Sequence, residues 1–513
     1  MSLQLDVNPL REGLTRERAV DPCIFVIFGG TGDLAHKKLL PALYHLHRAD
    51  LLPRGFGIIS YARETLTDEQ YRETVRHAVA AADQYLPTTG KSWDDFAANI
   101  YYISRTADDS AGLQHLKTRL DDLDPRIGTE GNYLFYFAIP PTAFAQTAED
   151  LGRVGLSKQE PGQGWRRLVV EKPFGTDLDS ARELNRVLLK SFTEDQIYRI
   201  DHYLGKETVQ NILVFRFANK FIEPLLNARY VDSVQITVAE SIGIETRGAF
   251  YDRTGALRDI VQNHVLQILS LVCMEPPVSL DANAVRDEKM KVFSAIRRME
   301  PRQVDEFTVR GQYSGGLLLG EKVLSYREER DVDPNSTTET FVAAKFFVDN
   351  WRWAGVPFYV RIGKRLAKRV TEIGIHLKGV PRVLFGESHR EEITPNVIAL
   401  NIQPNEGIST IFQAKVPGLD YRIQPVRMDF LYGEAFGETA PDAYERLLMD
   451  AMLGDAGLFS RADSLEATWE VVQPILEGWK MKQTPVNPYL PGSWGPAESA
   501  DLIQRDGRRW RRL

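Results

Sequence analysis

The segment CIFVIFGGTGDLA (Cys23–Ala35) joins a continuous apolar run to a glycine-rich turn. An apolar run such as Cys23–Phe28 is typical of a parallel strand that is covered on both faces. In the turn, Gly30-x-Gly32-x-x-Ala35 matches the dinucleotide fingerprint, whose glycines permit a tight turn and a close approach of the pyrophosphate. Because a buried strand precedes these glycines and a helical pattern follows them, they predict a nucleotide-binding turn. Its candidate coenzyme contacts are Gly29, Gly30, Thr31, Gly32, Asp33 and Leu34.

Apolar segments and helical patterns continue to alternate through the first part of the chain. This βαβ rhythm predicts a doubly wound parallel sheet, with ligands bound outside the carboxyl ends of the strands. After Cys23–Phe28, the predicted strands lie near residues 57–63, 100–104, 133–139 and 168–170. The predicted helices between them lie near residues 67–82, 111–120 and 144–151.

The end of the second predicted strand indicates which dinucleotide binds. An NAD enzyme places Asp or Glu there to accept a hydrogen bond from the ribose 2′-hydroxyl. Here Ser60 and Arg63 offer a hydroxyl and a guanidinium, which suit a 2′-phosphate. NADP is therefore the expected coenzyme, and Glu64 leaves NAD open as a weaker alternative. An ordinary surface arginine is the other interpretation of Arg63.

A later strand end carries the motif EKPFG (Glu171–Gly175). Because this motif follows a predicted parallel strand, Lys172 is placed to meet an anionic ligand group, and Pro173 makes the turn rigid. A lysine with only a structural role in the turn is the alternative interpretation.

The motif RIDHYLGKE (Arg199–Glu207) brings an acid, a histidine and a lysine into a short stretch. If the residues after Tyr203 are helical, His202 and Lys206 share one helix face. A helix start there also directs free backbone N–H groups and a positive dipole end at an anion. The motif therefore suits a phosphate monoester with a carboxylate close by; the alternative is a hydrogen-bonded loop histidine beside a solvated lysine.

The second half of the chain has a different pattern. Its strands follow one another without alternating helices, which predicts an antiparallel sheet and an α+β domain. They lie near residues 233–239, 341–347, 358–361, 372–377, 397–402 and 410–416, and terminal helices lie near 441–452 and 464–476.

An apolar helix is predicted over residues 259–272, after a turn-rich approach over 249–258. Its polar residues Asp259, Asn263 and His264 cost stability in a buried helix unless they are partnered. A hydrogen-bonded core histidine is the simplest interpretation of His264 taken alone.

Length and composition set limits on the function. The 513 residues suffice for two domains, and we expect an extension over residues 1–22 that is flexible, a Rossmann-like domain over 23–200 and an α+β domain over 201–513. A net charge of −7 argues against nucleic acid as a partner, and the basic end at Arg508–Arg512 is interpreted as a short solvated tail. No signal peptide or membrane helix is predicted. Cys23 and Cys273 lack metal-ligand spacing, so we expect no metal, two buried thiols and a cytoplasmic location.

From about Cys23 to about Asn487 the chain resembles the glucose-6-phosphate dehydrogenase family. The resemblance is carried, in chain order, by GGTGDLA at Gly29–Ala35, EKPFG at Glu171–Gly175, RIDHYLGKE at Arg199–Glu207, RDIVQNHVLQ at Arg258–Gln267, RIGKRL at Arg361–Leu366 and DAYERLLMDAM at Asp442–Met452. It implies a Rossmann-like coenzyme domain followed by an α+β domain with a large, mostly antiparallel sheet. It also implies a homodimer or homotetramer that assembles through this sheet.

The resemblance implies oxidation of β-D-glucose 6-phosphate at C1 to 6-phospho-D-glucono-1,5-lactone, the first step of the oxidative pentose phosphate pathway, with hydride transfer to NADP. His264 matches the general base and Asp201 the aspartate that orients it. These roles are physically sound, because imidazole exchanges protons near neutral pH and a carboxylate stabilises the imidazolium. A cis peptide bond between Lys172 and Pro173 is also implied. The substrate contacts that the resemblance implies are Lys38, Lys172, His202, Tyr203, Lys206, Glu240, Asp259, Lys364, Arg369 and Gln403.

Two other functions are considered. The first is a dehydrogenase of another sugar or sugar phosphate, although a neutral sugar gives the cations of His202 and Lys206 nothing to neutralise. The second is a catalytically inactive Rossmann protein that acts as a redox sensor. Such a protein is expected to lose the proton-relay pair, whereas Asp201 and His264 are both present.

Overall fold

The computed structural model of the chain describes residues 19–83, 88–105, 109–160, 162–318, 320–381, 393–419, 422–437 and 442–513. Contacts divide the chain into two compact units. Unit 1 comprises Met1–Lys206, Pro277–Asp287 and Pro441–Glu466, and unit 2 comprises Glu207–Pro276, Glu288–Ala440 and Ala467–Leu513. The predicted extension, residues 1–22, lies almost entirely outside the described residues.

Unit 1 is built on a parallel sheet with the strand order β17-β6-β5-β4-β1-β2-β3. All neighbours are parallel except β17, which runs antiparallel to β6. Every residue of β1 and β2 is buried, which explains why β1 is an unbroken apolar run and why β2 is apolar except for Ser60. The predicted doubly wound sheet is confirmed. The strands are β1 Cys23–Phe28, β2 Phe56–Ala62, β3 Ile100–Ser104, β4 Tyr133–Phe137, β5 Arg166–Val170, β6 Ile197–Ile200 and β17 Phe459–Ser460.

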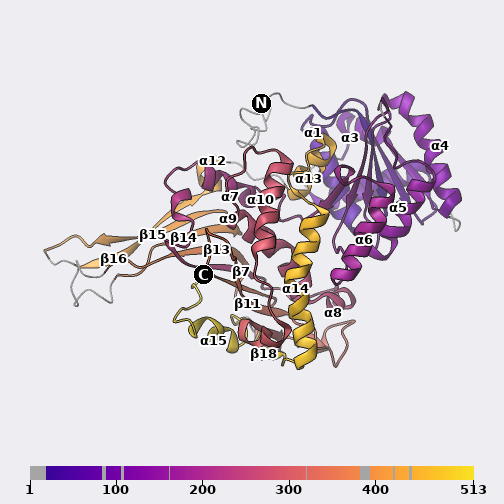
Figure 1. Cartoon of the computed structure of the whole chain (residues 1–513). Helices are drawn as coiled ribbons and strands as arrows, with labels where there is room; N and C mark the ends of the chain where they lie inside the picture. Colours follow the sequence, from indigo (N-terminus) through magenta and orange to yellow (C-terminus); the bar gives the residue numbers. More distant parts are fainter. Residues whose placement is uncertain are drawn as a thin grey trace. The chain divides into compact units, whose positions relative to one another are not determined.

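Helices cover both faces of this sheet, with α4, α5 and α6 on one side and α1 and α13 on the other (Figure 1). The helical run that follows the glycine turn is a π-helix over Ala35–Leu39 before it becomes α1. Thr67 and Gln70 form a capping box that starts α2. The helices are α1 Leu40–Arg48, α2 Asp68–Ala82, α3 Lys91–Ala98, α4 Asp109–Ile127, α5 Phe144–Arg153, α6 Leu178–Ser191 and α13 Ala443–Leu453.

Residues far along the chain complete unit 1. Leu447, Leu448, Ala451 and Met452 of α13, together with Phe459 of β17, belong to the same buried core as β1 and α1. The compact unit therefore takes in residues that the sequence assigned to a domain over 201–513, because their apolar side chains pack on the first sheet.

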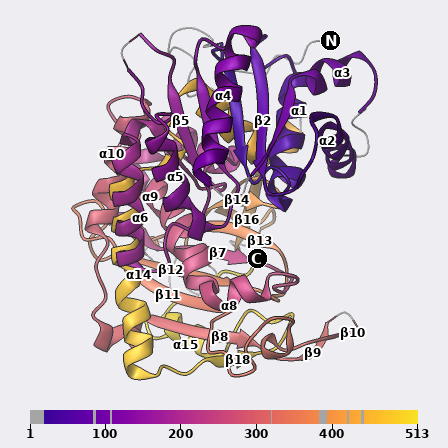
Figure 2. The same ribbon diagram turned by 90° about the vertical axis from the view of Figure 1, so that its right-hand side faces the viewer.

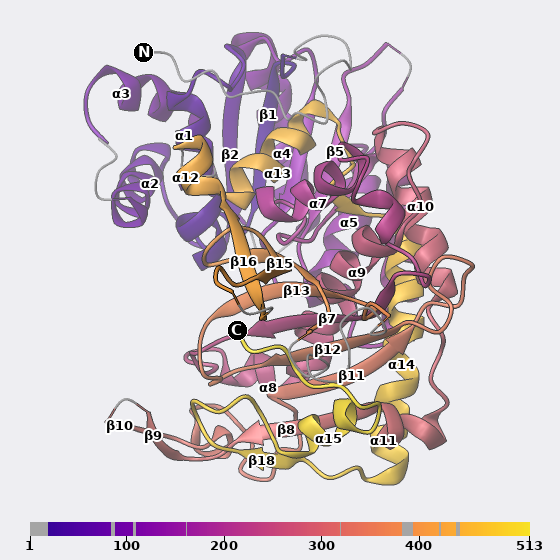
Figure 3. The same cartoon turned by 90° about the vertical axis from the view of Figure 1, so that its left-hand side faces the viewer.

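Unit 2 is built on a second sheet, with the strand order β16-β15-β14-β13-β7-β12-β11-β8-β18 among the described residues. Its neighbours are antiparallel except β7 with β12 and β8 with β18. The predicted large, mostly antiparallel sheet is confirmed, and Figure 3 shows its strands in succession. The strands are β7 Val231–Ala239, β8 Thr308–Tyr313, β11 Phe341–Phe347, β12 Pro357–Gly363, β13 Val370–Leu377, β14 Val397–Gln403, β15 Gly407–Lys415, β16 Ile423–Leu431 and β18 Asn487–Tyr489, with a separate pair β9 Gly316–Leu318 and β10 Glu321–Val323.

Figures 2 and 3 view this sheet from opposite sides, with α8 and α9 on one face and α15 and the C-terminal segment on the other.

The expectation of a turn-rich segment over 249–258 is wrong, since most of it forms α8. The remaining helices of unit 2 are α7 Glu207–Phe217, α8 Gly248–Ala256, the π-helix Leu257–Val265, α9 Leu266–Cys273, α11 Val304–Phe307, α12 Tyr432–Phe436 and α15 Glu498–Gln504, while α10 Ala282–Ala295 and α14 Ala462–Lys482 have residues in both units. Among the described residues, no helix has the length and apolar character that crossing a membrane requires.

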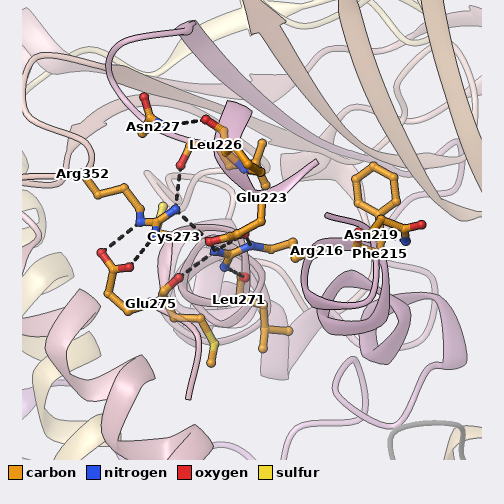
Figure 4. Close-up of polar contacts among 12 residues, drawn as sticks. Phe215, Arg216, Asn219, Glu223, Leu226, Asn227, Leu271, Cys273, Glu275 and Arg352 are labelled. Carbon is orange, nitrogen blue, oxygen red and sulfur yellow. Dashed lines mark hydrogen bonds and ion pairs between the residues drawn. The ribbon is translucent and has the colours of Figure 1, made fainter. Parts of the chain in front are cut away.

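A buried arginine joins α7 to α9 (Figure 4). The Arg216 side chain is 1% exposed and donates hydrogen bonds to the backbone oxygens of Leu271 (2.7 Å) and Met274 (2.8 Å). It also forms an ion pair with Glu223 at 3.0 Å, and Arg352 contacts the same carboxylate at 2.8 Å. This network fixes the C-terminal end of α9, the helix that continues the segment carrying His264.

The basic C-terminus is not a solvated tail, and this expectation is wrong. Arg508 pairs with Asp232 at 2.7 Å, and Arg511 pairs with Glu372 at 2.7 Å, with both partners of the second pair largely buried. Trp510 stacks against the guanidinium of Arg361. The arginines therefore neutralise carboxylates on the sheet of unit 2, a long-range pairing that the local sequence does not indicate.

Candidate active site

The glycine turn directly follows β1 at the carboxyl edge of the first sheet. Gly29 has a φ of +86°, and a Cβ there would lie 2.4 Å from the backbone oxygen of Ala138. A Cβ on Gly30 would lie 2.5 Å from the hydroxyl of Ser60. Only glycine fits at these two positions, so the backbone of β1 can turn sharply into a helix that begins at Asp33. The resulting cradle suits a pyrophosphate.

Ser60 is linked to the glycine turn through Tyr71 by two buried hydrogen bonds. It is fully buried, and its hydroxyl donates to the phenol oxygen of Tyr71 at 2.6 Å. The Tyr71 hydroxyl in turn donates to the backbone oxygen of Gly30 at 2.7 Å. Burial raises the pKa of Tyr71, which keeps this donor protonated. In the described structure the Ser60 hydroxyl is thus hydrogen-bonded to Tyr71, and its contact with the coenzyme 2′-phosphate stays a prediction. Tyr71 was missed by sequence reasoning, because it gave no signal beyond its place on a helix face.

Arg63 and Glu64 follow β2 and are both exposed. The Glu64 carboxylate accepts a hydrogen bond from the Thr31 hydroxyl in the glycine turn, at 2.6 Å. The Tyr102 hydroxyl donates to the backbone oxygen of Glu64 at 2.7 Å. The strand end that was predicted to read the ribose is therefore joined to the turn that was predicted to hold the pyrophosphate.

Glu171 and Lys172 leave β5 at the same edge of the sheet. The peptide bond between Lys172 and Pro173 is cis, as the resemblance implied. Tyr136 and Tyr444 donate hydrogen bonds to the Glu171 carboxylate at 2.5 Å and 3.1 Å. Burial raises the pKa of Glu171, although these two donors act in the opposite direction. Tyr444 of α13 thereby fixes the start of the turn that carries Lys172.

Lys38 lies in the π-helix beyond the glycine turn. Its ammonium forms an ion pair with Asp442 at 2.9 Å, and both side chains are about half exposed. Asp442 also caps α13, since its carboxylate accepts the backbone N–H of Tyr444 at 2.8 Å. Lys38 is therefore positioned by the motif DAYERLLMDAM, which the sequence associated with the family but not with this contact.

The segment after β6 forms a compact turn. The carboxylate of Asp201 accepts the backbone N–H of Tyr203 at 3.0 Å, and the Asp201 residue is buried. The Lys206 ammonium lies 4.2 Å from the centre of the Tyr203 ring. The helix begins only at Glu207, so the expectation that His202 and Lys206 share a helix face is wrong. A local hydrogen-bonded turn, closed by Asp201, takes the place of that first helical turn.

In unit 2, four candidate residues lie at one end of the second sheet. Ala239 of β7 pairs with Gly363 of β12 and with Val370 of β13, so the residues next to these positions are close in register. The neighbouring strand β14 ends beside β13, where the Gln403 amide donates to Thr371 at 3.1 Å. The four residues are Glu240, Lys364, Arg369 and Gln403.

Two of these side chains form a close ion pair. The Lys364 ammonium lies 2.5 Å from the Glu240 carboxylate, and the Lys364 side chain is 3% exposed. The ammonium is also 5.2 Å from the ring centre of Tyr251. A carboxylate held by one cation beside a strand end can accept hydrogen bonds from sugar hydroxyls.

The π-helix Leu257–Val265 carries the remaining two candidates. Asp259 and His264 are both buried, and His264 is fully so. Gln262 on the same helix donates to Thr468 at 3.0 Å, which fixes the helix within unit 2. Asp201 belongs to unit 1 and His264 to unit 2, so the pairing of these two side chains stays a prediction.

These features define a Rossmann-type, dinucleotide-binding protein whose second unit carries a polar cluster at the end of a large sheet. Two family models match the chain. "Glucose-6-phosphate dehydrogenase, NAD binding domain" matches residues 26–211, and "Glucose-6-phosphate dehydrogenase, C-terminal domain" matches residues 213–511. The chain belongs to the glucose-6-phosphate dehydrogenase family.

Individual relatives are similar over nearly their whole length. The glucose-6-phosphate 1-dehydrogenase of Aggregatibacter actinomycetemcomitans is 47% identical over 490 residues, which cover 96% of this chain and 97% of the relative. Glucose-6-phosphate 1-dehydrogenase 2 of Mycobacterium tuberculosis (strain H37Rv) is 45% identical over 507 residues, with 98% of each chain covered. A solved glucose-6-phosphate dehydrogenase in complex with glucose 6-phosphate superposes with a TM-score of 0.87 at 35% identity, covering 97% of this chain and 100% of that chain.

Proposed function

We propose that this chain oxidises glucose 6-phosphate at C1 to 6-phosphogluconolactone, with NADP as its coenzyme. The observation that supports this most strongly is the pair of family matches over residues 26–211 and 213–511. Together they include all the residues predicted for the chemistry, from Gly29 to Gln403. As a member of the family, the chain is an oxidoreductase of carbohydrate metabolism.

The described residues of unit 1 fit a dinucleotide. A side chain at Gly29 or Gly30 would fill the cradle, so the cradle has the shape that a pyrophosphate needs. Backbone N–H groups from Gly30 to Leu34 would hold the phosphates, while Arg63 would contact the 2′-phosphate and Lys172 would lie on the nicotinamide side. When bound, NADP supplies the acceptor for the hydride that leaves C1.

The chain's own residues supply the proton chemistry and the binding. In the proposed site, the His264 imidazole takes the proton of the C1 hydroxyl, and Asp201 orients the ring and stabilises its charged form. The turn from His202 to Lys206 binds the phosphate of the substrate, since it offers cationic groups directly before a helix start. The polar cluster at the end of the second sheet, from Glu240 to Gln403, binds the sugar hydroxyls.

Initial rates with glucose 6-phosphate, glucose and other sugar phosphates test this function. We expect kcat/KM for glucose 6-phosphate to exceed that for glucose by orders of magnitude, because only the phosphate engages Lys206. Equal values for both sugars would contradict the proposal. A higher value for a different sugar phosphate would favour the first alternative function, and no turnover of any sugar would favour the sensor.

We also propose that the chain assembles as a homodimer or homotetramer in the cytoplasm. Among the residues that the structure describes, strand β16 is the edge strand of the unit 2 sheet, and it exposes Val426 (47%), Met428 (62%) and Phe430 (39%). An exposed apolar edge strand is a ready site of association. The two cysteines are free and buried, which supports a reducing compartment.

A further inference from the structure

A buried glutamate lies against the start of the π-helix Leu257–Val265. Glu339 is 3% exposed, and its carboxylate accepts the backbone N–H of Leu257 at 2.9 Å. The backbone oxygen of Glu339 accepts the N–H of Ala256 at 3.0 Å. The first N–H groups of a helix have no acceptor within the helix itself. Glu339 therefore supplies the acceptors for two successive donors at this helix start.

The backbone just before the π-helix is shaped to admit this side chain. Gly255 has a φ of +68° and forms the kink between α8 and the π-helix. A Cβ on Gly255 would lie 2.5 Å from the Glu339 carboxylate. The positive φ favours glycine, and the absence of a side chain lets the carboxylate reach the backbone. The direction in which the π-helix leaves α8 is thus coupled to the position of Glu339.

Glu339 itself is anchored on the sheet of unit 2 through the residue that follows it. The Thr340 N–H donates to the backbone oxygen of Gly311 on β8 at 2.8 Å. The Thr340 backbone oxygen accepts the N–H of Lys364 at 3.0 Å, and the Thr340 hydroxyl lies 2.8 Å from that of Tyr489. Lys364 belongs to the polar cluster at the end of the sheet. Two adjacent residues therefore join this cluster to the π-helix.

The side chains around this junction lie close together. The ring of Tyr251 on α8 has the Lys364 ammonium 5.2 Å from its centre. Burial raises the pKa of Tyr251, and the nearby carboxylates of Asp259 and Glu339 act in the same direction. A buried carboxylate costs stability unless it is partnered, and the Leu257 N–H partners Glu339.

We propose that Glu339 is a positioning residue for the oxidation of the sugar phosphate. Because it caps the π-helix from a strand end, it sets where Asp259 and His264 stand relative to the polar cluster. This role rests on the proposed function, in which His264 is the base and the polar cluster binds the sugar. A displacement of about 1 Å can slow a reaction about 100-fold, even when the changed residue is far from the reacting atoms.

The experiment compares kcat of the parent chain, Glu339→Ala and Glu339→Gln with glucose 6-phosphate and NADP. Alanine removes the acceptor for the Leu257 N–H, whereas glutamine keeps an oxygen in the same place. We expect alanine to lower kcat about 10- to 100-fold and glutamine to restore it to within about 3-fold of the parent chain. The dissociation constant for NADP should stay the same in all three proteins, because the glycine turn belongs to unit 1.

Two features of the design separate positioning from a loss of folded protein. The rate is expressed per NADP-binding site, counted by calorimetric titration, so a variant that only folds less well has fewer sites and an unchanged kcat. The matched control is Glu328→Ala. The Glu328 carboxylate accepts the backbone N–H of Ser325 at 2.9 Å and caps the short helix Tyr326–Glu328 of unit 2. Its removal should leave kcat unchanged.

Hydrogen exchange distinguishes a failure of this role from a failure of the proposed function. Peptides from Leu257–Val265 should exchange about 10-fold faster in Glu339→Ala than in the parent chain or in Glu339→Gln. Unchanged exchange, a parental kcat in Glu339→Ala or an equally low kcat in both Glu339 variants would overturn the positioning role. Absence of turnover in the parent chain would overturn the proposed function and this role with it, whereas the exchange rates would still show whether Glu339 caps the helix.

Discussion

Replacing Arg216 with leucine should loosen the end of α9 without touching the proposed chemistry. The substitution removes the donors to the backbone oxygens of Leu271 and Met274 and the ion pair with Glu223 (Figure 4). Breaking a buried ion pair typically costs about 3–5 kcal/mol. Because Arg352 still contacts Glu223 at 2.8 Å, and that carboxylate is 19% exposed, we expect the lower end, about 3 kcal/mol.

Hydrogen exchange of the backbone amides measures this change without assuming that the whole chain unfolds in one step. A loss of about 3 kcal/mol corresponds to about 100-fold faster exchange in peptides from α9, Leu266–Cys273. Peptides from α6 should not change, since that helix belongs to unit 1. Arg216→Lys should recover only part of the protection, because an ammonium lacks the planar fork of the guanidinium.

The matched control is Arg186→Leu. Arg186 forms an ion pair with Glu183 on α6, and both side chains are more than half exposed. Exposed helix pairs contribute about 0.5 kcal/mol or less, so exchange should hardly change. Unchanged exchange in α9 of Arg216→Leu would mean that the Arg216 network does not fix the end of α9.

Three other perturbations test separate parts of the structure. Lys206→Gln should raise KM for glucose 6-phosphate at least about 10-fold with little change in NADP binding, and steady-state kinetics with a coenzyme titration will show whether it does. Burial lowers the pKa of His376 from 6.5 to about 4. Between these two pH values His376 is protonated in the unfolded chain but not in the folded chain, so the free energy of unfolding falls as the pH drops from about 6.5 to about 4. His376→Gln should remove up to about 3 kcal/mol of that loss in urea titrations across the window, whereas His77→Gln, at an exposed site, should not. Met428→Asp on β16 should shift the sedimentation of the chain toward a monomer, and an unchanged oligomer would place the interface elsewhere.

The first sheet could be predicted because its strands are buried on both faces. Each residue of β1 is apolar for the same reason that it is enclosed, so the run itself reveals the environment. The position of Lys172 follows from the parallel topology, since the carboxyl ends of parallel strands share one edge. Sequence alone therefore indicated where the coenzyme turn and the lysine lie, and the structure agrees.

Other features depend on hydrogen-bond and ion-pair partners that the sequence pattern does not specify. The hydrogen bond from Ser60 to Tyr71 could not be predicted from the position of Ser60 at a strand end. The sequence of the C-terminal arginines is typical of a solvated tail, but in the structure they form ion pairs with Asp232 and Glu372. The turn after Asp201 replaced a predicted helical turn, because its carboxylate binds a backbone N–H locally. A sequence pattern does not specify which of several available partners a polar side chain will bind.

The proposed chemistry depends above all on His264, which removes the proton of the C1 hydroxyl. The most direct measurement is kcat of His264→Asn with glucose 6-phosphate, together with the dissociation constant for NADP of the same protein. If His264 is the base, kcat should fall by orders of magnitude while the dissociation constant for NADP stays near that of the parent chain. Turnover close to that of the parent chain would contradict it.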